Sequence, residues 1–143
     1  MKNKPRLSYR LQQFKQALWP PSQAVETDQV RTHLTPSQLA LFRQLQPSEQ
    51  WHAYNVLQKL KNSGQKNLDL LTAALLHDIG KIHYPLKVWE RGLIVVMSRV
   101  APHQVQRWGQ ETPQGLSRPF VVACHHAEWG ADLAARALQA PAQ

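Results

Sequence analysis

Residues 67–81 read NLDLLTAALLHDIGK, and this stretch decides the fold. Asn67 is a residue type that caps helices, and the positions after it are apolar on almost every side of a helix. A helix that is apolar all round is covered by other elements, so we expect it to be the central, buried helix of the protein. The helical pattern ends at the pair His77-Asp78. Gly80, a residue type that commonly ends helices, follows at once.

The pair His77-Asp78 joins a neutral nitrogen donor to an anionic oxygen donor, a combination suited to a divalent metal ion. Inside a helix, neighbouring side chains point about 100° apart, but at a helix end both can turn toward one ion. Lys81 adds a positive charge one short step away, where a phosphate group would sit. The alternative interpretation is structural, with a buried histidine beside an aspartate that caps a helix.

A second histidine supports the metal site through its spacing. His52 lies 25 residues before His77, and the midpoint falls at Gly64-Gln65, within a polar stretch typical of a turn. If the helices on either side fold back antiparallel about this turn, the two histidines lie at the same height on facing helices. The spacing therefore predicts that His52 reaches the same ion as His77 and Asp78.

Prolines and capping residues predict further helices on both sides of this hairpin. The expected segments are a helix from Leu7 to Leu18, a polar loop over residues 20–34, and helices over residues 35–45, 47–62, 85–100, 102–108, 119–125 and 127–138. The most apolar run, Gly92 to Met97, is far too short to span a bilayer. We therefore expect a buried core helix there and no transmembrane segment.

The chain resembles the HD superfamily of metal-dependent phosphohydrolases, whose pattern is a His followed later by a His-Asp pair. The likeness covers nearly the whole chain. Besides His77 to Lys81, it includes motifs that look like one bacterial subfamily: Tyr9-Arg10-Leu11, Phe14, Leu34-Thr35-Pro36, Leu41-Phe42, Glu49-Gln50-Trp51-His52, Tyr84-Pro85-Leu86, Trp89, Arg107-Trp108-Gly109, Arg118-Pro119-Phe120 and His126-Ala127-Glu128-Trp129-Gly130-Ala131. The resemblance implies a single all-α HD-domain helical bundle over residues 1–143. Residues 1–34 would form an N-terminal helix and loop, and residues 35–143 the metal-binding core.

The resemblance also implies hydrolysis of a phosphomonoester or phosphodiester, often of a nucleotide. We expect His52, His77 and Asp78 to hold one divalent metal ion. Their donor types suit Mn, Fe, Mg, Co, Ni or Zn. The bound metal would polarise a phosphoryl oxygen and lower the pKa of a water molecule. The expected catalytic residues are Asp78 and Lys81, with Lys81 steadying the charge of the phosphoryl group.

The family pattern closes with an Asp from a late helix, and no residue up to Gln143 matches it. We therefore expect the last helix to be absent and the ligand set to be one residue short. His126 and Asp132 are the first candidates to complete it. His126 is expected either as a ligand of a second metal ion or as a contact to phosphate.

The net charge is +8, from 17 Lys and Arg against 9 Asp and Glu. Such a charge attracts phosphate-rich partners, which include a phosphorylated small molecule or nucleotide, nucleic acid and anionic lipid. The alternative is a basic, solvated surface. Two rival functions remain open: a catalytically weak or inactive HD-type domain that binds nucleotide, metal or a protein partner, and a nucleic-acid binder that acts through charge alone.

The single cysteine, Cys124, cannot form an internal disulfide, which favours a reducing compartment and predicts a cytoplasmic protein. It stands beside His125, but adjacent residues on a helix do not face each other. We therefore interpret Cys124 as a buried structural thiol. The N-terminus is charged and amphipathic rather than apolar, so it does not predict a signal peptide.

Overall fold

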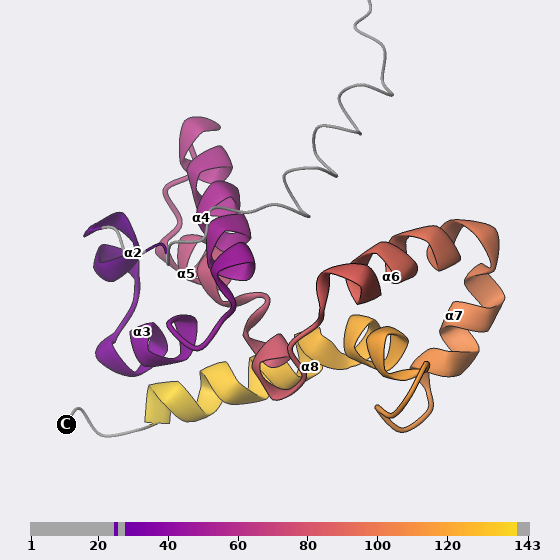
Figure 1. Cartoon of the computed structure of the whole chain (residues 1–143). Helices are drawn as coiled ribbons and strands as arrows, with labels where there is room; N and C mark the ends of the chain where they lie inside the picture. Colours follow the sequence, from indigo (N-terminus) through magenta and orange to yellow (C-terminus); the bar gives the residue numbers. More distant parts are fainter. Residues whose placement is uncertain (1–24, 26–27, 140–143) are drawn as a thin grey trace, which may run out of the picture.

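The computed structural model describes Val25 and residues 28–139, and every regular element within these residues is helical (Figure 1). The all-α prediction is therefore confirmed for this part, whereas the helix predicted from Leu7 to Leu18 lies outside it. The elements are α2 (Asp28–His33), α3 (Pro36–Phe42), α4 (Pro47–Asn62), α5 (Leu68–Leu76), the 3₁₀ helix η1 (Ile79–His83), α6 (Val88–Val100), α7 (Pro102–Gly109) and α8 (Arg118–Gln139). Among these described helices, none is both long and apolar enough to cross a membrane.

The predicted hairpin of α4 and α5 is confirmed. Pro47 stands at the start of α4, where its missing N–H costs nothing. The turn that follows contains Gly64, whose φ of +83° lies in the left-handed region that glycine adopts without strain. The Asn67 side chain accepts a hydrogen bond from the backbone N–H of Leu70 at 3.1 Å and so caps α5. The two helices pack directly against each other.

The second half of α5 lies in the core, as predicted, but its first turn does not: Leu68 is 67% and Leu70 41% exposed, so the expectation of a helix covered on all sides is wrong there. The core residues come from α2 to α5, the turns between them and η1, and they are Val30, Leu34, Phe42, Leu45, Ala53, Leu57, Leu71, Leu75, Leu76 and Ile79. The polar loop predicted over residues 20–34 is wrong in its second half, because Asp28–His33 form α2. The cause is tertiary packing: Val30 is fully buried and holds this short helix on the core.

Gly80 fixes how α8 crosses the end of the hairpin. A Cβ atom at Gly80 would lie 1.9 Å from the carbonyl oxygen of His126 and 2.7 Å from the backbone nitrogen of Gly130. The backbones of η1 and α8 therefore touch, with a glycine on each side of the contact. Gly80 has no positive φ and follows α5 by several residues, so its role is close approach rather than the predicted ending of a helix.

Helix α8 runs unbroken from Arg118 to Gln139, so the two separate helices predicted over residues 119–125 and 127–138 are wrong. No proline or capping residue separates those segments, and the backbone hydrogen bonds continue through them. The continuous helix buries Phe120 and Val121, whereas Cys124, one turn further along, lies beside Gly109 of α7, where an added Cβ would be 2.3 Å from its Sγ. Cys124 is exposed, which corrects its interpretation as a buried thiol.

Helix α6 differs from its prediction in its start and in its burial. It begins at Val88 rather than Pro85, because the Glu90 carboxylate accepts a hydrogen bond from the backbone N–H of Lys87 and caps the helix there. The run Gly92 to Met97 is not a buried core helix. Only Glu90 is buried along α6, which packs on α7 and α8 with one face and leaves the other uncovered.

An ion pair fastens α6 to α8, and it yields a prediction about stability. Arg118 Nη1 lies 2.6 Å from Oε1 of the buried Glu90, and Arg118 also donates to the carbonyl of Pro85 at 2.8 Å. Replacing Arg118 with Gln should lower the free energy of unfolding by ~1–2 kcal/mol, because a buried carboxylate loses its charged partner. Urea denaturation measures this loss.

The matched control for Arg118→Gln is Arg136→Gln, the same change on the same helix. Arg136 pairs with Asp132 at 2.7 Å, but both side chains are well exposed to solvent. Exposed pairs contribute little, so this variant should unfold close to the wild-type denaturant midpoint. Equal midpoints for the two variants would show that the Arg118–Glu90 pair does not hold α6 in place.

Candidate metal centre

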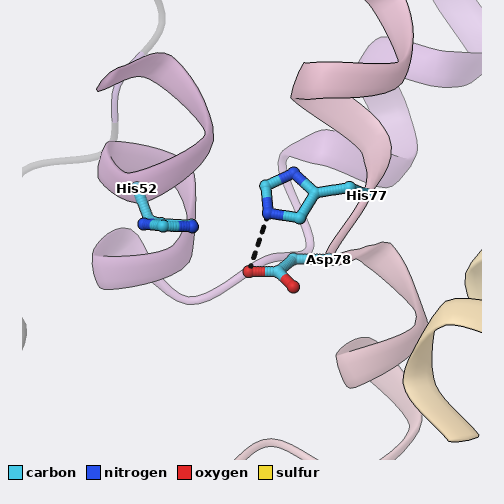
Figure 2. A group of neighbouring side chains, drawn as sticks. All are labelled: His52, His77 and Asp78. Carbon is cyan, nitrogen blue, oxygen red and sulfur yellow. Dashed lines mark ion pairs between the residues drawn. The ribbon is translucent and has the colours of Figure 1, made fainter. Parts of the chain in front are cut away.

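Three side chains of metal-ligating type meet at the open end of the hairpin (Figure 2). His52 comes from the middle of α4, His77 is the residue that ends α5, and Asp78 precedes η1. One ligand atom from each lies within 4.8 Å of the others, and the centres of the two imidazole rings are 5.3 Å apart. The structure therefore brings together the three residues that the hairpin spacing predicted for one ion.

The distances are close to those that a shared ion requires. His77 Nε2 lies 3.5 Å from Asp78 Oδ2. Ligand atoms at 2.0–2.2 Å from a metal are separated by roughly 3.0–3.5 Å in tetrahedral or octahedral sites. The pair His77-Asp78 already has this separation, and a small side-chain movement of His52 would bring in the third donor. These three residues could hold a metal ion.

The protonation of the histidines suits a ligand role. His77 Nδ1 lies 2.8 Å from the carbonyl oxygen of Ala74, so Nδ1 carries the proton and the lone pair of Nε2 faces Asp78. For His52, burial lowers the pKa of the imidazole, and attraction by Asp78 offsets only part of that effect. A lower pKa favours the neutral ring, which is the form that binds metals.

Asp78 is buried and remains anionic. Burial by itself would raise the pKa of this carboxyl, but the positive charges around it, that of Lys81 first, outweigh burial and hold the pKa below its ordinary value. Lys81 Nζ lies 2.8 Å from Oδ1. The two oxygens therefore serve different neighbours, because Oδ1 faces Lys81 while Oδ2 faces the ring of His77.

His126 approaches the same carboxylate from α8. Its Nε2 lies 3.5 Å from Asp78 Oδ1, and its Nδ1 contacts the carbonyl oxygens of Val122 at 2.9 Å and Ala123 at 3.0 Å. With Nδ1 donating to these carbonyls, the Nε2 lone pair points at an anionic oxygen, as it does in His77. The positive charge nearest to this pair is that of Lys81, whose Nζ lies 2.8 Å from the same Oδ1.

Of the other candidate residues, one contacts the cluster and two do not. His126 touches the Asp78 carboxylate but lies outside the three residues whose atoms can share one ion, so its role at a second ion or at phosphate stays a prediction. Asp132 is exposed on α8 and pairs with Arg136, so the structure does not bring it to the cluster. His125 contacts the Gly109 carbonyl and Glu128, away from Asp78.

The sequence interpretation missed Glu49 as part of this site. Glu49 is buried on α4 and lies one turn before His52, so the two residues share a helix face. Burial raises the pKa of Glu49, against the attraction of Lys81 and Arg91, and the charge of Asp78 raises it further. The sequence did contain a signal for this: Glu49 stands three residues before the candidate ligand His52, a spacing that places both on one face of a helix.

No protein-family model matches the chain, and neither a curated protein nor a solved structure matches it at a significant level. The likeness to the HD superfamily therefore rests on the motif residues alone. The geometry of His52, His77 and Asp78 is independent of that likeness, because it follows from the positions of the side chains themselves.

Proposed function

We propose that this protein is a metal-dependent phosphohydrolase of the HD type, acting on a phosphomonoester or phosphodiester such as a nucleotide. The observation that carries the proposal is the convergence of two imidazoles and one buried carboxylate, within 4.8 Å of one another, beside a lysine. Two neutral nitrogens with one anionic oxygen suit several divalent metals, among them Mn, Fe, Co, Ni and Zn, and Mg when more oxygen donors join.

Each residue has a role in this proposal. When bound, the metal ion would supply a Lewis acid for a phosphoryl oxygen and a water of lowered pKa. Asp78 supplies the anionic ligand, and the hydrogen bond from His77 Nδ1 to Ala74 keeps the Nε2 lone pair directed at the ion. Lys81 is partly exposed beside Asp78 Oδ1, so its ammonium group can contact a phosphate oxygen from the solvent side.

The test begins with metal content. Protein purified without chelator is analysed for divalent metals, and the metal-free form is then reloaded with Mn, Mg or Zn. Release of phosphate from nucleoside monophosphates, cyclic phosphodiesters and a nitrophenyl phosphate is measured with each metal. We expect turnover that needs the metal and stops on chelation. If the protein is fully loaded with metal and hydrolyses none of these esters, the proposal of a phosphohydrolase is refuted.

Lys81 offers a prediction that separates metal binding from phosphate contact. Replacing Lys81 with Met removes the cation but none of the three proposed ligands. Turnover should fall by ~10-fold to 100-fold, because a preorganised charge on the phosphoryl group is lost, while metal content is retained. The control is Lys66→Met, since Lys66 is exposed in the turn between α4 and α5, at the opposite end of the hairpin from Asp78. Full activity of Lys81→Met would remove Lys81 from the mechanism.

One observation favours a second candidate, a non-catalytic domain that binds a nucleotide. The ammonium group of Lys81 sits 2.8 Å from Asp78 Oδ1 and already neutralises the carboxylate that a metal requires. In that case an anionic ligand would bind at Lys81 and His126 without hydrolysis. Saturable nucleotide binding by a protein that turns over no ester with any metal would support this candidate over the enzyme.

A further inference from the structure

Helix α6 carries an uncovered apolar face, which we call the outer face of α6. It consists of five side chains with the following exposed fractions: Val88 51%, Trp89 55%, Val95 43%, Val96 53% and Val100 75%. Their spacing places them on one side of the helix, since residues three, four and seven apart are neighbours on its surface. The less exposed residues Ile94 and Met97 lie on the opposite side of the helix, and α6 contacts α7 and α8. Figure 1 shows α6 joined to α7, with α8 below α6 in this view.

The outer face is contiguous and unobstructed. Gly92 lies within it, and a Cβ atom placed there would meet nothing within 4 Å. Single exposed apolar residues are ordinary on protein surfaces, but a continuous stripe of valines with a tryptophan marks an interaction site. This also explains why the sequence of α6 has the composition of a buried helix.

The charges around the outer face are basic. From Lys87 to Gly109 the exposed ionisable groups include Lys87, Arg99 and Arg107, and the single acid of this segment, Glu90, is buried against Arg118. Arg99 lies on the same side of α6 as Val88 and Val95, given its spacing from both. The occupant of this face is therefore expected to be anionic.

This charge argues against two occupants from the protein itself. A second copy meeting the outer face symmetrically would bring its own Arg99 and Lys87 against the same residues, with no acid between them. The N-terminal segment, residues 1–24, is also basic and contains no Asp or Glu. Like charges across a contact oppose association, so both occupants are disfavoured.

We propose that the outer face of α6 binds the anionic surface of a phospholipid bilayer. The valines would enter the boundary between headgroups and acyl chains, Trp89 would lie at the interface, and Lys87 and Arg99 would contact lipid phosphates. The helix would lie on the membrane and not cross it. The proposal is independent of the metal site, because none of its residues is a proposed ligand.

Stable attachment to a membrane surface generally needs two weak signals. The outer face of α6 has both, because its valines and Trp89 are exposed and apolar while Lys87 and Arg99 beside them are basic. A bilayer offers apolar chains below a layer of phosphates, which matches this combination. This favours the bilayer as occupant.

The test uses co-sedimentation of the full chain with vesicles. Vesicles of phosphatidylcholine alone are compared with vesicles that also contain phosphatidylglycerol, at low and high salt. Two variants add the same charge to the same helix: Val96→Asp on the outer face and Ser98→Asp off it. We expect binding to the anionic vesicles only, weakened by salt. Binding should fall about tenfold in Val96→Asp, through lost apolar burial, and stay near wild type in Ser98→Asp.

Three outcomes would overturn the proposal. The first is equal loss of binding in both variants, which would assign the effect to charge alone. The second is absence of binding to anionic vesicles, or equal binding to neutral ones. The third is a wild-type dimer in sedimentation equilibrium that Val96→Asp separates, which would assign the face to a second copy. Circular dichroism of both variants establishes that each is folded, so that a loss is a property of the face.

Discussion

Replacing Asp78 with Asn should abolish the binding of divalent metal and, with it, any phosphate-ester hydrolysis. The amide keeps the shape of the side chain but removes the only anionic donor among the three proposed ligands. Loss of an outer partner of a metal ligand alone weakens binding 10–100-fold, so loss of the ligand charge itself should weaken it by more than about 100-fold. Calorimetric titration with Mn and elemental analysis of the purified protein measure this directly.

The control is Asp69→Asn, the same change in the first turn of α5. Asp69 is exposed in the first turn of α5, far along the helix from His77, so metal affinity should be unchanged. Circular dichroism should show both variants folded. Unchanged metal content in Asp78→Asn would refute the assignment of the metal site. Loss of metal without a change in turnover would support the metal site but refute its proposed role in hydrolysis.

Replacing Gly80 with Ala should destabilise the protein by about 3 kcal/mol, a large part of the stability of a domain this size. The added Cβ would lie 1.9 Å from the carbonyl oxygen of His126 and 2.7 Å from the nitrogen of Gly130. Both are backbone atoms of α8, which cannot rotate away as a side chain can. The helix must therefore shift as a body, and His126 must leave Asp78.

Gly92→Ala is the matched control, because a Cβ at Gly92 meets nothing within 4 Å in the interior of α6. Alanine is the better helix former, so this variant should be as stable as wild type or up to about 1 kcal/mol more stable. Urea denaturation compares the three proteins. A Gly80→Ala protein with the wild-type midpoint would show that η1 and α8 do not touch in solution.

The hairpin and its site could be predicted because their signals are local. Gly64 marks the turn, Asn67 caps α5, and the spacing between His52 and His77 fixes which positions face each other. The His-Asp pair at the end of an apolar helix was also visible in the sequence. No long-range information was needed to bring His52, His77 and Asp78 together.

The failed predictions depend on contacts between distant segments. The exposure of Val96 is decided by which face of α6 packs on the rest of the molecule, and composition does not encode that choice. Glu49 was missed because an isolated acid on a polar helix ordinarily belongs to the solvated surface.

The residues of the candidate site come from different helices, so they meet one after another while the chain is being synthesised. His52 and His77 belong to one hairpin with a short turn, and local contacts of this kind form fastest. The carboxylate of Asp78 follows directly in the chain, so a nascent polypeptide that has left the ribosome only as far as η1 already holds three donors. His126 arrives after two further helices, when α8 closes over Gly80. We therefore expect the three donors to be able to hold an ion before α8 docks, because no residue of α8 is among them.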